Sequence, residues 1–239
     1  MRNWFDLMWS ALARAWDRQL DFPLPERMHR PAADGENPWE LAALPVLGWL
    51  LGLVATLPGW LAERVFSPGA GALIFALVGF LALTFRDSGR SDGAVAAAVA
   101  SALPGNELPW RLIVPVMLMI VRFALLLAVF SGGCRWQLPL VFAGIFAGET
   151  LLTLDGGFAP PLLPDAPGAR RNFWIAAAAV TLISFLCGRL ATALGAAAFV
   201  AVWQIFQRRA EREGTDLARI GLAGSLIGWV VLLAGLFAI

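Results

Sequence analysis

The chain has 239 residues, of which 59% are hydrophobic and 15% charged, and its mean hydropathy is +0.71. Soluble domains average about 45–50% apolar and about 25% charged residues, so this composition argues against an ordinary soluble globular protein. The net charge of +1 provides no global basic field for nucleic acid, and the single histidine, His29, excludes a site built from several histidines. Cys134 and Cys187 form neither a disulfide framework nor a zinc pattern.

The first twenty residues predict an amphipathic helix that lies on the cytoplasmic face of a membrane. Its apolar residues recur at helical spacing: Trp4, Phe5, Met8, Leu12, Ala15 and Trp16. The segment 21–39 contains four prolines and several charges, which predict an irregular connector. We therefore expect residues 1–40 to form a cytoplasmic helix and connector, and residues 41–239 to form a single transmembrane domain.

Seven apolar blocks are candidate transmembrane helices, because a span needs about 20 mainly apolar residues. They are Leu41–Leu61, Gly69–Phe85, Pro109–Phe130, Gln137–Leu154, Phe173–Gly188, Leu190–Phe206 and Ile220–Ala238. Only Arg189 separates the fifth block from the sixth, which predicts either a hairpin or one broken helix. The stretch 93–103 is too short to span and is expected to be interfacial or re-entrant. The predicted fold is all-α: a polytopic integral membrane bundle of about seven helices plus the N-terminal interfacial helix.

The arginines predict how the bundle is oriented. Only Arg64, Arg135 and Arg189 fall on one side of the predicted spans, whereas fourteen of the 18 basic residues fall on the other. The positive-inside rule places that richer side in the cytoplasm. We therefore expect a multi-pass protein of the cell (inner) membrane, with its N-terminus in the cytoplasm and its C-terminus outside.

Glycines recur four residues apart in three of these blocks, at Gly48/Gly52, Gly144/Gly148 and Gly224/Gly228. Glycine at this spacing allows two helix backbones to approach closely. We expect these pairs to mark contacts between transmembrane helices.

Two ionisable residues lie deep inside the apolar blocks, where charge is costly and often functional. Arg122 lies near the middle of the third block, and Glu149 lies in the fourth, nearer its cytoplasmic end. One interpretation is a polar cavity that opens to the cytoplasm. The other is a structural Arg122–Glu149 pair, or an Arg122 bonded to backbone carbonyls.

Acidic residues outside the blocks gather on the predicted cytoplasmic side: Asp87, Asp92, Asp155, Asp165, Glu211, Glu213 and Asp216. Mg²⁺ is typically held by one or two carboxylates together with phosphate oxygens, and arginine binds phosphate in a bidentate manner. The segment 87–92, with its glycine and short spacing, is therefore a candidate site for Mg²⁺ and a diphosphate. A solvated polar turn would show the same pattern.

Four segments in chain order resemble the integral-membrane cobalamin synthases (adenosylcobinamide-GDP ribazoletransferases). Residues 44–52, Leu-Pro-Val-Leu-Gly-Trp-Leu-Leu-Gly, are similar to the family's first span. Residues 84–93, Thr-Phe-Arg-Asp-Ser-Gly-Arg-Ser-Asp-Gly, occupy the place of its acidic signature. Residues 121–125, Val-Arg-Phe-Ala-Leu, resemble its Leu-Lys-Phe-Ala-Leu, and residues 208–216 resemble the basic turn that precedes its last span.

The resemblance implies a membrane transferase of late cobalamin biosynthesis. Such an enzyme joins α-ribazole, or its phosphate, to adenosylcobinamide-GDP and releases GMP. Under this hypothesis Asp87, Asp92 and Arg122 are catalytic, and Mg²⁺ is held by Asp87 and Asp92 with Asp155 or Asp216. Arg86 and Arg90 contact the diphosphate together with Arg122. The partners are then the lipid bilayer and these two substrates, and no nucleic acid is expected.

Departures from the family pattern leave two other hypotheses open. Only Asp92-Gly93 fits the acidic signature without a gap, and the last span has no carboxylate between Gly221 and Gly228, where the family carries acids. A catalytically inactive relative would act as a membrane scaffold or subunit, with another membrane or cobalamin-pathway protein as its partner. A small transporter would instead use Arg122 and Glu149 to line its path.

Overall fold

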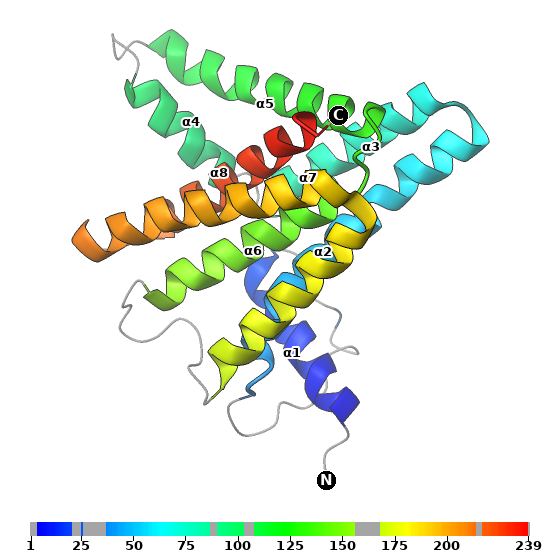
Figure 1. Ribbon diagram of the computed structural model, residues 1–239. Helices are drawn as coiled ribbons and strands as arrows, with labels where there is room; N and C mark the ends of the chain where they lie inside the picture. The colour runs from blue at the N-terminus through cyan, green and yellow to red at the C-terminus, as the bar shows by residue number, and fades with distance from the viewer. Residues whose placement is uncertain are drawn as a thin grey trace.

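The computed structural model describes residues 4–20, 25, 37–86, 90–102, 108–155, 168–213 and 217–238. Within the helices, the backbone alone is described at positions 4, 18, 90–92, 101, 102, 108–112, 155, 210, 211, 213, 217 and 218. The described residues form helices without any strand (Figure 1): α1 Trp4–Gln19, α2 Glu40–Val65, α3 Pro68–Phe85, α4 Arg90–Ala102, α5 Leu108–Ser131, α6 Gln137–Asp155, α7 Ala169–Glu213 and α8 Leu217–Leu236. The predicted all-α bundle is confirmed.

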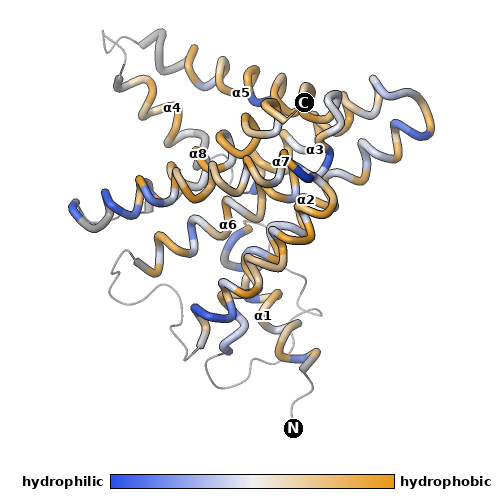
Figure 2. The backbone as a smooth tube through the Cα atoms, viewed as in Figure 1, coloured by the Kyte–Doolittle hydropathy of each residue, from blue (hydrophilic) through white to orange (hydrophobic). Residues whose placement is uncertain are grey.

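Among the described residues, six helices are long and apolar enough to cross a membrane: α2, α3, α5, α6, α7 and α8. Hydrophilic residues gather near the turn between α2 and α3 and at both ends of α7 (Figure 2). The seven predicted blocks fall on six helices because the fifth and sixth both belong to α7. With only 13 residues, α4 is too short to cross, as its sequence predicted.

The long helix α7 breaks at Arg189, whose φ of 45° and ψ of −119° are not helical. Positive φ is uncommon for a residue with a side chain, because Cβ crowds the backbone there. The first arm, 169–188, and the second arm, 190–213, diverge from this point as a V (Figure 1). Of the two predicted alternatives for this region, the structure has the broken helix.

The bundle packs around α6, which contacts α2, α7 and α8. Glycines allow these close contacts, as their spacing predicted. A Cβ on Gly48 of α2 would lie 2.6 Å from the carbonyl oxygen of Phe142 in α6, closer than real Cβ atoms approach. Gly148 of α6 faces the side chain of Ile227 in α8, whose terminal methyl group would have to move to admit a Cβ.

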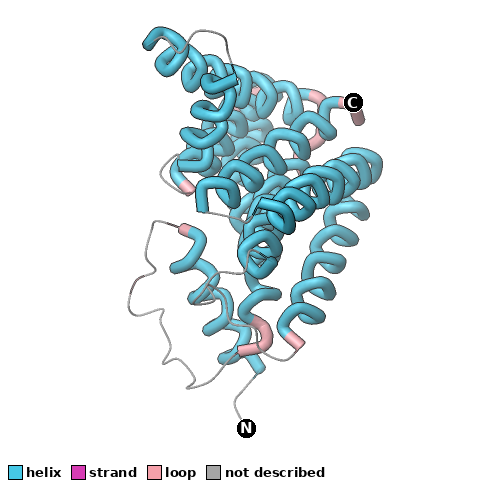
Figure 3. The backbone as a smooth tube through the Cα atoms, turned by 90° about the vertical axis from the view of Figure 1, so that its left-hand side faces the viewer, coloured by secondary structure: helices cyan, strands magenta, loops and turns pink. Residues whose placement is uncertain are grey.

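The amphipathic helix α1 forms as predicted and packs against the start of α2. Arg14 pairs with Glu40 at 3.2 Å, and the side-chain amide of Asn37 donates to the Leu7 carbonyl oxygen at 2.9 Å. Ala11 is fully buried by this contact. Figure 3 shows α1 at the end of the bundle that lies nearest the N-terminus.

Candidate functional site

A buried ion pair joins the end of α3 to the middle of α6. Arg86 follows the last residue of α3, and its side chain is only 4% exposed. Its Nη1 donates to Glu149 Oε2 at 2.8 Å and its Nη2 donates to Glu149 Oε1 at 2.9 Å. The guanidinium also lies over the ring of Phe146, one turn before Glu149, at 5.6 Å from the ring centre. A two-point contact of this kind is the strongest arrangement that an arginine and a carboxylate can make.

This pairing corrects one of the two sequence interpretations, because the carboxylate of Glu149 binds Arg86 and not Arg122. Arg122 is also buried, at 6% exposure, but it reaches α8. There its Nη2 donates to Ser225 Oγ at 3.3 Å, and its guanidinium lies 5.0 Å from the ring centre of Trp229. The physical reason is that α5 packs against α8, whereas α6 presents Glu149 to the side chain that enters from the end of α3.

The two arginines nevertheless belong to one region, which we call the buried polar cluster: Arg86, Arg122, Glu149 and Ser225. The carboxylate of Glu149 lies against Gly224 of α8, so closely that no Cβ would fit there. The next residue, Ser225, accepts the hydrogen bond from Arg122. Charged and hydroxyl groups from α3, α5, α6 and α8 therefore meet around a single turn of α8.

A small cavity borders the buried polar cluster. Its volume is about 140 Å³, and among the described residues its lining comprises Gly93, Val95, Pro115, Leu118, Met119, Arg122 and Trp229. The sequence predicted a polar cavity that opens to the cytoplasm. The cavity beside Arg122 differs from that prediction, because the other described side chains that line it are apolar or aromatic and Glu149 is not among them. Among the described lining residues, Arg122 carries the charge.

The start of α4 reaches the same cavity. Gly93 lines it, and Asp92 is the residue immediately before Gly93 in the first turn of α4. The helix α4 packs against both α5 and α8. The Asp92-Gly93 step and Arg122, far apart in sequence, are thus brought to one place.

Most of the other predicted ligands fall where the structure gives no side chain. Asp87, Asp165 and Asp216 lie outside the described residues, and Arg90, Asp92, Asp155, Glu211 and Glu213 have a described backbone only. In the described part of the chain, no three His, Cys, Asp or Glu side chains are grouped so that they could hold a metal ion. The Mg²⁺ site at Asp87 and Asp92 therefore stays a prediction.

Sequence analysis missed the roles of Ser225 and Trp229 and the partner of Arg86. Ser225 carries the only hydroxyl group in the last apolar block, which is a signal that it serves an internal contact. Arg86 gave no such signal, because an arginine that follows an apolar block normally lies in water or among head groups.

Compared with known proteins, the chain matches no protein-family model, no curated protein and no solved structure.

Proposed function

We propose that the chain is a membrane transferase of the cobalamin-synthase type, which joins α-ribazole or its phosphate to adenosylcobinamide-GDP and releases GMP. One observation carries the proposal. The two segments that resemble the family's acidic signature and its basic span, 84–93 and 121–125, both reach the cavity that Gly93 and Arg122 line. The segments were matched on sequence alone, and their meeting at one cavity is what a shared site requires.

The chemistry assigns different tasks to the two buried arginines. A hydroxyl group of α-ribazole attacks the phosphoryl group attached to cobinamide, the bond to GMP breaks, and negative charge spreads over the phosphoryl oxygens. Arg122, which faces the cavity, would stabilise that charge. Both Nη atoms of Arg86 are engaged by Glu149, so Arg86 acts as a positioning residue that anchors the end of α3.

The carboxylates of the site would come from the corner between α3 and α4. Asp92 would accept the proton of the attacking hydroxyl, and Asp87 and Asp92 would hold Mg²⁺ with Asp155. When bound, Mg²⁺ would neutralise charge on the diphosphate. Arg86 immediately precedes Asp87 in the sequence. The Arg86–Glu149 pair would therefore anchor the chain where this corner begins.

The direct test is a reconstituted reaction. The full chain is purified in detergent and incubated with adenosylcobinamide-GDP, α-ribazole phosphate and Mg²⁺, and mass spectrometry follows the cobalamin product and GMP. We expect product that disappears with EDTA. We expect Asp92→Asn and Arg122→Gln to lower the rate by about a hundredfold or more, as loss of a charge-stabilising group does. Arg64 is exposed and lies over the ring of Trp60. Arg64→Gln is therefore the matched control and should keep the wild-type rate.

A second function is favoured by the Arg86–Glu149 pair itself. An arginine held at both Nη atoms by a buried carboxylate has the bonding pattern of a structural element. This favours a relative that kept the fold as a membrane scaffold or subunit and lost the chemistry. No product from folded protein, measured beside an active cobalamin synthase, would overturn the transferase. Co-purification of another membrane protein would then support the scaffold.

A further inference from the structure

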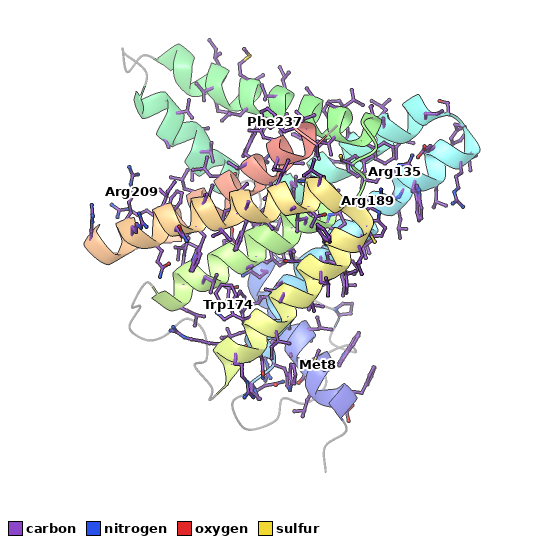
Figure 4. The ribbon with its side chains drawn as sticks, in the orientation of Figure 1. Met8, Arg135, Trp174, Arg189, Arg209 and Phe237 are labelled. Atoms are coloured by element: carbon purple, nitrogen blue, oxygen red, sulfur yellow. The ribbon has the colours of Figure 1, made fainter. Side chains whose placement is uncertain are left out.

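The V of α7 is held open by specific hydrogen bonds near its apex. Thr192 Oγ1 donates to the carbonyl oxygen of Ser184 across the break at 2.9 Å. Trp49 Nε1 of α2 donates to Ser184 Oγ at 3.0 Å and ties the first arm to the bundle. Figure 4 labels Trp174 on the first arm, Arg189 at the apex and Arg209 near the end of the second arm.

A cavity of about 510 Å³ lies between the two arms, with α6 beneath it. Small residues of α6, among them Ala143, Gly144 and Ala147, form its floor. At the end away from the apex, the rings of Trp174 and Trp203 meet between the arms, with their centres 5.9 Å apart. Trp174 lines the cavity, so its contact with Trp203 lies at the border of the cavity.

The lining offers almost nothing to a polar ligand. The hydroxyls among the described lining residues belong to Thr181 and Thr192, and both are already bonded to backbone carbonyls. Leu182, Phe185 and Val200 line the cavity and are also exposed, so the cavity opens onto the apolar outer surface of α7. All of these residues lie within Ala169–Arg209, a helix long and apolar enough to cross a membrane.

Cations stand at the ends of both arms, beyond the tryptophan pair. Arg170 and Arg171 are exposed and lie about one turn before Trp174. Arg208 and Arg209 are exposed and follow Trp203 by less than two turns. Tryptophan favours the level of the lipid head groups, and arginine there attracts anionic lipids.

We propose that this cavity binds an acyl chain of an anionic phospholipid from the bilayer, with the phosphate of the same lipid beside the arginines at the ends of the arms. Ligand cavities commonly measure about 300–1,000 Å³, so the space suits a single hydrocarbon chain. A partner helix fits poorly, because one turn of a helix about 10 Å wide and 5.4 Å long already occupies about 400 Å³. The cavity would hold little more than one such turn.

The experiment compares lipid retained by purified protein. The full chain is extracted from membranes in a mild detergent, and bound phospholipid is quantified by native mass spectrometry. We expect wild-type protein to carry phospholipid that is enriched in phosphatidylglycerol over phosphatidylcholine after incubation with mixed vesicles of both. Ala196→Phe places a ring in the cavity and should lower retention by about tenfold.

The neighbouring position supplies the matched control. Ala197 is exposed on the same arm but is not among the residues that line the cavity, so Ala197→Phe should retain lipid as the wild type does. Ala178→Phe against Ala179→Phe repeats the comparison on the first arm, should Ala196→Phe fail to fold. The double variant Arg170→Gln/Arg171→Gln should remove the preference for phosphatidylglycerol while a phospholipid remains bound.

Two outcomes would overturn the proposal. Equal retention by Ala196→Phe and Ala197→Phe, with Ala178→Phe also equal to Ala179→Phe, would mean that the bound lipid lies elsewhere on the protein. A protein dimer that Ala196→Phe abolishes, with no phospholipid bound to the wild type, would mean that a second copy of the chain covers the cavity.

Discussion

At the scale of single residues, Arg86 and Glu149 compensate each other's charge inside the bundle. Taking two charges out of water is costly, and the cost is recovered only when each group is fully bonded by the other. Here both Nη atoms of Arg86 meet both oxygens of Glu149, and the aromatic face of Phe146 covers the guanidinium. The pair therefore ties α3 to α6 only as long as both partners are present.

We expect Glu149→Gln to destabilise the protein by about 3–5 kcal/mol, because it removes the negative charge that bonds both Nη atoms of the buried Arg86. Replacing both residues together, as Arg86→Met/Glu149→Leu, should cost much less than the single change. The measurement is the midpoint of chemical unfolding in detergent. Glu63→Gln is the control, because Glu63 pairs with a more exposed Arg135 and such pairs contribute about 0–1 kcal/mol. A single change that costs no more than the double change would contradict this account.

Cys134 provides a residue-scale prediction about pH. It lies in the turn between α5 and α6, where burial raises the pKa of its thiol above the usual value. Because the thiolate is the reactive form, a raised pKa lowers the thiolate fraction at every pH below it. In Cys187→Ser protein, we therefore expect the rate of alkylation by N-ethylmaleimide to rise at higher pH than it does for the same protein unfolded in denaturant. Coincident rate profiles would show that the turn does not bury the thiol.

At the scale of helices, hydropathy predicted the spans well because each span is a continuous apolar run. The sequence does not decide between a hairpin and a broken helix in α7, because a single residue, Arg189, separates the two apolar runs. The site was less predictable. Arg122 and Glu149 were both found from their depth in apolar blocks, but which charge meets which depends on helix packing that a linear pattern does not encode.

The contact between α2 and α6 gives the prediction that belongs to this scale. Gly48→Ala would push a Cβ to 2.6 Å from the backbone carbonyl oxygen of Phe142, so the two helices would have to separate. We expect a loss of about 1–3 kcal/mol, as overpacking typically costs. Gly69→Ala in α3 is the control, because a Cβ there meets no atom within 4 Å and alanine favours a helix. Thermal unfolding of the two variants in the same detergent should separate them, and equal melting temperatures would argue against close packing of α2 on α6.

At the scale of the whole molecule, the bundle has two unlike ends. Arg135 and Arg189 lie near each other in Figure 4, and Arg209 lies at the opposite end of the second arm of α7. Glu63, near the end of α2, pairs with Arg135 at 2.5 Å, so the ends of α2 and α5 belong to the same side. Arg135 and Arg189, from the sparse group of arginines, therefore lie at the other end of the described helices from Arg209, which belongs to the rich group.

This arrangement predicts the orientation in the membrane. In a protein with Cys134→Ser and Cys187→Ser, Ser67→Cys at the exposed turn between α2 and α3 should react with a membrane-impermeant maleimide in intact cells. Arg209→Cys should react only after the cells are permeabilised. The reverse pattern would mean that arginine number does not set the topology here, and it would also move the cavity next to Arg122 away from cytoplasmic nucleotides. Because the proposed transferase needs a nucleotide substrate at that end of the bundle, the labelling experiment tests the orientation on which that function depends.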